Sequence, residues 1–147
     1  MPPASAIQGD QIVTYLNDNI GMTLGAGECW DAADSAIRHI GAARPGSDLY
    51  VWGRVVLQAD LQPGDILQFN QFTTTVTEAD GSWSQLSFGA PRHTAIVESI
   101  NSDGSVNILQ QNYDGVRAIA GLRNVFLSAG GNVRTSGRVT RYRPMVP

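Results

Sequence analysis

The segment Gly25-Ala-Gly-Glu-Cys-Trp30 carries a glycine-rich turn that leads into an apolar-periodic stretch, with Cys29 at the junction. Over residues 29–42 the apolar side chains fall on one helical face. Several of them, including Ala32 and Ala36, are alanines, which let a helix lie close to its neighbour. We therefore expect Cys29 to begin a helix that packs closely on a sheet.

A second amphipathic helix is expected upstream, over residues 10–20. Ile12, Leu16 and Ile20 recur every fourth position, and Asp10 is a plausible N-cap. Gly21 is placed to end this helix. Residues 1–6 are expected to form a flexible leader.

Beyond a helix-ending turn at residues 44–47, the apolar pattern changes from helical to alternating. Turn signals at residues 79–81 and 101–104 predict two hairpins. The expected strands cover residues 66–69, 72–77, 82–88, 93–100, 105–111, 122–127 and 139–142. Helices followed by an antiparallel sheet are the order of an α+β domain, so we expect a single domain over residues 7–143.

Composition excludes several classes of protein. Of the 147 residues, 42% are hydrophobic and 16% are charged, which argues against disorder. The net charge of −3 gives no electrostatic reason to bind nucleic acid or an anionic membrane. No apolar run approaches the ~20 residues of a membrane helix, and the first ten residues lack the features of a signal peptide. We expect a monomer that is cytoplasmic or exported by a non-classical route.

Cys29 is the single cysteine, so no intramolecular disulfide can form. A thiol at a helix N-terminus lies near the positive end of the helix dipole, which favours the nucleophilic thiolate. The adjacent carboxylate of Glu28 opposes this effect. The alternative is that Cys29 is a small buried hydrophobic residue without a chemical role.

Only one of the two histidines is placed to act as a base for Cys29. His39 lies about three turns away along the same helix, whereas His93 opens a strand. If a two-residue turn closes the hairpin at residues 101–104, His93 faces Asn112, and Gln110 lies on the same side of the sheet. Either amide could accept a hydrogen bond from the imidazole and fix its tautomer. One cysteine and two distant histidines do not form a usual zinc site, so we expect no metal and no cofactor.

Four motifs in order resemble those of a known family. They are Gly27-Glu-Cys-Trp30, Leu61-Gln-Pro-Gly-Asp-Ile66, His93-Thr-Ala-Ile-Val97 and Leu109-Gln-Gln-Asn112. Together they resemble the CHAP domain, a cysteine, histidine-dependent amidohydrolase/peptidase of the NlpC-type branch of the papain-like superfamily. The resemblance covers residues 7–142 and implies a papain-like fold, with N-terminal helices packed on an antiparallel sheet.

The resemblance implies Cys29 as nucleophile and His93 as general base and acid. It places Gln110 where family members commonly carry a glutamate and Asn112 at their asparagine, and it places Trp30 and Glu28 beside the nucleophile as substrate-binding residues. A neutral Gln110 orients the imidazole but stabilises the imidazolium less than a carboxylate does. The implied reaction is cleavage of an amide bond in a peptide or in a peptidoglycan stem peptide.

Two other functions remain open. A closer resemblance is to the C-terminal domain of fungal actin-patch adaptors and to some plant proline-rich proteins. It is carried by Gly25-x-Gly-Glu-Cys-Trp30, Tyr50-Val-Trp-Gly53 and Pro63-Gly-Asp-Ile-Leu-Gln-Phe69. It implies a catalytically quiet binding or adaptor module. The remaining alternative is a thiol acyltransferase or deamidase that acts as a toxin. The reactivity of Cys29 towards an electrophile separates the enzyme from the binding module.

Overall fold

The computed structural model describes residues 1–44 and 48–147; the expected turn residues 45–47 lie outside them. The helices are α1 (Ala6–Asn17), α2 (Cys29–His39) and the 3-10 helix η1 (Gln58–Asp60). The strands are β1 (Arg54–Val55), β2 (Ile66–Thr77), β3 (Trp83–Ile100), β4 (Val106–Gln110), β5 (Ala120–Val125) and β6 (Val133–Arg143).

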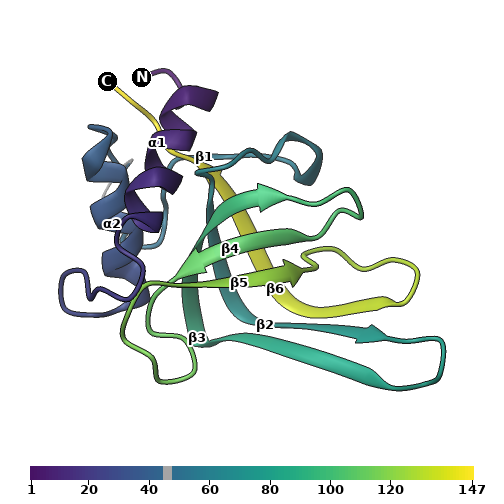
Figure 1. Cartoon of the computed structure of the whole chain (residues 1–147). Helices are drawn as coiled ribbons and strands as arrows, with labels where there is room; N and C mark the ends of the chain where they lie inside the picture. The colour runs from purple at the N-terminus through teal and green to yellow at the C-terminus, as the bar shows by residue number, and fades with distance from the viewer. Residues whose placement is uncertain (45–47) are drawn as a thin grey trace.

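The strands form one six-stranded sheet in the order β1-β6-β2-β3-β4-β5, and every paired neighbour is antiparallel. The two α-helices lie together at one end of the sheet, while the β2–β3 hairpin extends to the far end (Figure 1). The expected α+β class is confirmed.

Helix α1 begins earlier than the periodicity predicts, because Ser5 is its N-cap. The Ser5 hydroxyl accepts the Gln8 N–H at 3.2 Å, and the Gln8 side chain accepts the Ser5 N–H at 2.9 Å. This reciprocal capping box satisfies two backbone donors at the helix start. Asp10, expected as the cap, lies inside the helix.

The N-terminal residues, expected to form a flexible leader, contact the C-terminal segment in the structure. Pro3 pairs with Met145 in an antiparallel bridge, and the Ala4 N–H donates to the Pro144 carbonyl at 2.8 Å. Ala4 is only 4% exposed. The two chain ends lie next to each other beside the helices (Figure 1), so the C-terminal segment holds the N-terminal one.

Two apolar clusters lie on opposite faces of the sheet. Side chains alternate along a strand, so neighbouring residues of β3 belong to different clusters. Ile96 packs with α2 residues such as Ala33 in the first cluster. Ala95 and Val97 pack in the second cluster, away from the helices. This division decides which side chains of β3 face α2.

A row of irregularities bends the three longest strands at the same level. Gln71 in β2, Gly89 in β3 and Gly137 in β6 all have positive φ, and the register of β2 with both neighbours shifts there. A Cβ on Gly137 would overlap the carbonyl oxygen of Gln71. β2 and β3 are therefore each one continuous strand with a bend. The apolar alternation predicts two shorter strands in the place of β2 and two in the place of β3.

Candidate functional site

Cys29 begins α2 as predicted and is partly exposed. The turn before it is held by Asp31, whose carboxylate accepts the N–H groups of Ala26 and Glu28, each at 3.1 Å. A Cβ on Gly25 would come within 2.8 Å of the Asp31 carboxyl carbon. Glycine at this position therefore allows the turn to close on the helix start.

Gln111, which directly follows β4, is hydrogen-bonded to the same turn. Its side-chain oxygen accepts the Leu24 N–H at 2.8 Å, and its nitrogen donates to the carbonyls of Leu24 at 3.0 Å and Glu28 at 2.8 Å. The sequence reasoning missed this role. The alternation that puts Gln110 on the side of His93 puts Gln111 on the other side, towards α2.

The Glu28 carboxylate is paired on both oxygens. Arg117 donates to Oε1 at 2.6 Å, and Asn112 donates to Oε2 at 3.0 Å. Asn112, with φ of 57°, has turned away from the strand direction. Asn112 therefore contacts Glu28, one residue before the cysteine, and it makes no hydrogen bond to His93 in the described part of the chain.

His93 is held by Gln110. Its Nε2 lies 2.8 Å from Gln110 Oε1, and the two side chains are 5% and 2% exposed. An amide oxygen only accepts hydrogen bonds, so Nε2 carries the proton and Nδ1 is the acceptor. The rings of Phe69, Phe88 and Tyr113 surround the imidazole, with centroids 6.3, 5.9 and 5.6 Å from its own. Burial lowers the pKa of His93, and the Gln110 hydrogen bond raises it in part.

The structure does not join Cys29 to His93. No hydrogen bond links the thiol to either imidazole nitrogen within residues 1–44 and 48–147. His93 shares its face of β3 with Ala95, in the second apolar cluster, whereas α2 packs on the face of Ile96. Of the candidate catalytic residues, His93 and Gln110 are hydrogen-bonded to each other, whereas Asn112 is hydrogen-bonded to Glu28.

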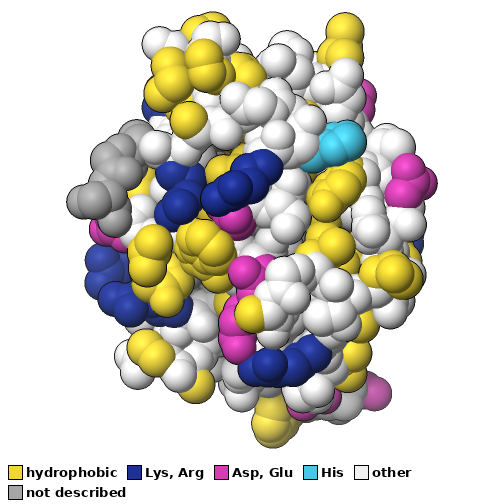
Figure 2. Space-filling model, turned by 90° about the vertical axis from the view of Figure 1, so that its left-hand side faces the viewer, with side chains coloured by type: hydrophobic (Ala, Val, Ile, Leu, Met, Phe, Trp, Pro, Cys, Tyr) yellow, Lys and Arg dark blue, Asp and Glu magenta, His cyan; other side chains and the backbone are white. Residues whose placement is uncertain are grey.

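Trp30, expected to contact substrate, is engaged inside the domain. Its indole N–H donates to the Leu49 carbonyl at 2.7 Å, and its ring lies 5.7 Å from the Trp52 ring between centroids. The Arg44 guanidinium lies over the same indole, 4.7 Å from its centroid. These contacts fix Trp30 against the loop that follows α2. The surface on this side mixes basic, acidic and hydrophobic side chains (Figure 2).

A hollow of about 570 Å³ opens beside His93. Arg92, Asn112, Tyr113 and Asp114 line it together with His93 and the bent part of β3 near Gly89. Cys29 is not among its lining residues. The hollow therefore gives access to the histidine side of the site from the edge of β3.

Across the described residues, no group of three or more His, Cys, Asp or Glu side chains is placed to hold a metal ion. Nor does any helix there have the length and apolar character needed to cross a membrane.

The domain has the cysteine proteinase fold. Its second helix begins at a cysteine and packs on an antiparallel sheet that carries a histidine–amide pair. More narrowly, the chain belongs to the AIM3/BBC1 cysteine proteinase-fold domain family, whose model matches residues 2–146.

A curated relative shows the same relationship. The chain is 24% identical over 155 aligned residues to altered inheritance of mitochondria protein 3 of Debaryomyces hansenii. The alignment covers 93% of the chain and 16% of that relative, so the chain spans about one sixth of its length. No solved structure matches the chain.

Proposed function

We propose that this domain is a catalytically quiet binding module that keeps the cysteine proteinase fold. The observation that carries this proposal is that no hydrogen bond joins the expected nucleophile to its expected base among the described residues. His93 is bonded to Gln110 and enclosed by aromatic rings, while Cys29 has no hydrogen bond to it in the described chain. A cysteine without a base at hydrogen-bonding distance lacks the usual activation of a thiol nucleophile.

The contacts at the start of α2 support the same proposal. Glu28 is held by Arg117 and Asn112, and Asp31 accepts the N–H groups of Ala26 and Glu28. The polar side chains beside Cys29 are therefore paired within the domain, and none of them is hydrogen-bonded to the thiol among the described residues.

The family context also favours binding. The curated relative is about six times as long as this domain, which is the arrangement of a module carried by a larger chain. The resemblance of the three motifs within residues 25–69 to the C-terminal domain of fungal actin-patch adaptors supports the same role. On this proposal, the domain contributes a docking surface to a larger protein.

Alkylation of Cys29 by iodoacetamide tests the proposal, because the single thiol gives one product that mass spectrometry can follow. We expect the alkylation rate of Cys29 to rise with pH in the same way as the alkylation rate of glutathione. We also expect His93→Gln to change the rate at pH 7 by less than about three-fold, with Cys29→Ala as the blank. A rate that levels off below pH 7 and falls about ten-fold or more in His93→Gln contradicts a quiet module.

The second candidate function is the cysteine amidohydrolase of the CHAP type. The observation in its favour is that the Gln110 hydrogen bond occupies Nε2 and leaves Nδ1 as the acceptor, the state that a general base needs. Catalysis then requires His93 and Cys29 to approach each other when substrate binds. Release of new amino termini from purified peptidoglycan or casein, lost in Cys29→Ala, supports this candidate; no release by either protein speaks against it.

A further inference from the structure

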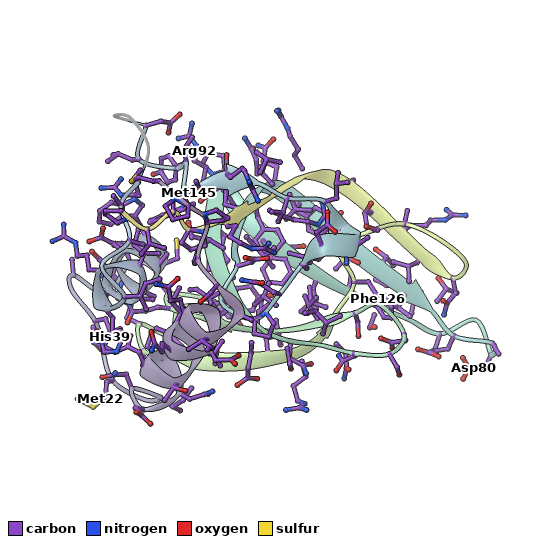
Figure 3. All side chains as sticks on the ribbon, turned by 90° about the horizontal axis from the view of Figure 1, so that it is seen from above. Met22, His39, Asp80, Arg92, Phe126 and Met145 are labelled. Carbon is purple, nitrogen blue, oxygen red and sulfur yellow. The ribbon has the colours of Figure 1, made fainter. Side chains whose placement is uncertain are left out.

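A polar hollow lies on the helix-facing side of the sheet, where the helices no longer cover it. It has a volume of about 260 Å³ and is lined by the loop residues Asp48 and Tyr50 and by side chains of β2, β3 and β6. In Figure 3, Arg92 lies towards the helix end of the sheet, far from Asp80 at the tip of the β2–β3 hairpin. The hollow is separate from the histidine–amide pair, which faces the other side of β3.

Two arginines flank the hollow in one row across three strands. Asn70 in β2 pairs with Arg92 in β3 on one side and with Arg138 in β6 on the other. Directly paired residues point to the same face, and two strand spacings put the arginine Cα atoms roughly 9.5 Å apart. Both side chains can therefore reach a group that sits over Asn70.

The floor of the hollow is rigid and already hydrogen-bonded. Gln68, 8% exposed, accepts hydrogen bonds from the Trp52 indole N–H at 2.9 Å and the Thr94 hydroxyl at 2.7 Å. The Gln68 amide nitrogen donates to the carbonyl of His93 at 3.2 Å. A fixed polar floor favours a ligand that is polar on the side facing the sheet.

The lining of the hollow carries a positive net charge. Neither Arg92 nor Arg138 has an ion pair among the described residues. The Arg92 guanidinium is held 4.5 Å above the Tyr50 ring, so part of its conformational freedom is already lost before a ligand binds. Among the described residues, Asp48 is the one acid that lines the hollow, so together with Arg92 and Arg138 the lining carries a net charge of +1. That charge matches a single carboxylate better than a phosphate, which carries nearly two negative charges.

A neighbouring hollow extends the surface. Arg92 also lines the larger hollow of about 570 Å³ beside His93, which follows the edge of β3. Within the described chain, β4 pairs with β3 only from Ala95 onward, so the preceding edge of β3 has no strand partner on that side. A ligand held at Arg92 can continue along this edge if it is an extended peptide.

We propose that Arg92 and Arg138 bind one carboxylate of a peptide over Asn70, either an acidic side chain or a free C-terminus. Guanidinium groups suit this ligand because their donors match the two oxygens of a carboxylate. The proposal deepens the binding role given above by naming the chemistry of the partner.

Titration of the ¹⁵N-labelled protein by NMR tests the site through the Nε–H signals of Arg92 and Arg138. The probes are acetyl-Ala-Ala-Glu-amide, acetyl-Ala-Ala-Gln with a free carboxyl group, acetyl-Ala-Ala-Gln-amide and inorganic phosphate. We expect saturable shifts with one or both carboxylate peptides and none with the neutral peptide. Binding by the first probe alone assigns a side-chain carboxylate, and binding by the second alone assigns a C-terminus.

Matched variants complete the experiment. Arg92→Gln and Arg138→Gln should each weaken binding about ten-fold or more, whereas Arg123→Gln, an exposed arginine on β5, should leave it unchanged. Equal shifts with the neutral peptide, an equal loss in Arg123→Gln, or tighter binding of phosphate than of either carboxylate peptide overturns the proposal. Because no readout involves Cys29, such a failure leaves the alkylation result for the quiet module standing.

Discussion

The imidazole of His93 and the side-chain amide of Gln110 form a buried pair, with 2.8 Å between Nε2 and Oε1. The pair fixes the tautomer of the histidine, and the surrounding aromatic rings of Phe69, Phe88 and Tyr113 restrict its position. A neutral amide in this place orients the ring without stabilising its protonated form as a carboxylate does. Burial lowers the pKa of His93, and the Gln110 hydrogen bond opposes this effect only in part, so the pair orients the ring while burial favours its neutral form.

Gln110→Glu should raise the pKa of His93. The substitution nearly preserves shape and places a carboxylate against Nε2, and an opposite charge nearby favours the imidazolium by about one pH unit or more. The titration of the His93 ring protons by NMR measures this directly. Asn112→Asp is the matched control, because Asn112 contacts Glu28, so it should move the His93 titration much less. Equal shifts in the two variants would contradict the pairing with Gln110.

The free energy of unfolding should fall as the pH drops from 7 towards 5, in part because of His93. Burial lowers its pKa below 6.5 in the folded protein, so the unfolded chain binds more protons in this range. The free energy of unfolding therefore rises with pH until the pH reaches about the pKa of His93 in the unfolded chain. For one titrating group the slope is at most about 1.4 kcal/mol per pH unit. Urea unfolding at pH 5, 6 and 7 should show a smaller slope in His93→Gln than in the wild type.

The register beside His93 could be predicted from the sequence, although the hairpin does not close as expected. The pairs Ala95–Gln110 and Ile96–Leu109 match the predicted alignment. Near the turn, however, the Asn101 N–H bonds to the Ser105 carbonyl, one residue beyond the expected partner. A shift in register between Val97 and Ser99 restores the alignment. A bulge of this kind leaves no mark in the apolar pattern, because residues 93–97, which precede it, are buried on both faces of the strand.

The same double burial explains why the sequence did not predict that His93 and α2 lie on opposite faces of β3. Thr94, Ala95, Ile96 and Val97 are all fully buried, so alternation cannot tell which face α2 covers. That choice is made by packing, through contacts such as Ile96 with the alanines of α2. The position of Cys29 at the helix start depends on local sequence alone, and it was predicted correctly.

Asp65→Asn should lower the free energy of unfolding by about 3 kcal/mol. Asp65 is completely buried and accepts from Arg143 at 3.0 and 2.9 Å and from the Gln62 N–H at 2.9 Å. The substitution keeps the shape but leaves the mostly buried guanidinium without its counter-charge. Urea denaturation measures the loss, and Asp10→Asn on the exposed side of α1 should change stability by less than about 0.5 kcal/mol. A loss no larger than that of the control would show that water satisfies Arg143.

Gly9→Ala tests the packing of α1 against the turn that leads into β2. Gly9 lies inside α1, where intrinsic helix preference favours alanine over glycine by about 1 kcal/mol. A Cβ at this position would overlap the carbonyl oxygen of Pro63, a backbone atom that cannot rotate away. We therefore expect a net destabilisation of about 1–3 kcal/mol by urea denaturation, because steric overlap outweighs helix preference. Gln11→Ala, at an exposed position on the same helix, should change stability by only a few tenths of a kcal/mol. If Gly9→Ala instead stabilises the protein, α1 lies farther from the turn in solution, and the close contact that fixes the helix layer at this end of the sheet does not form.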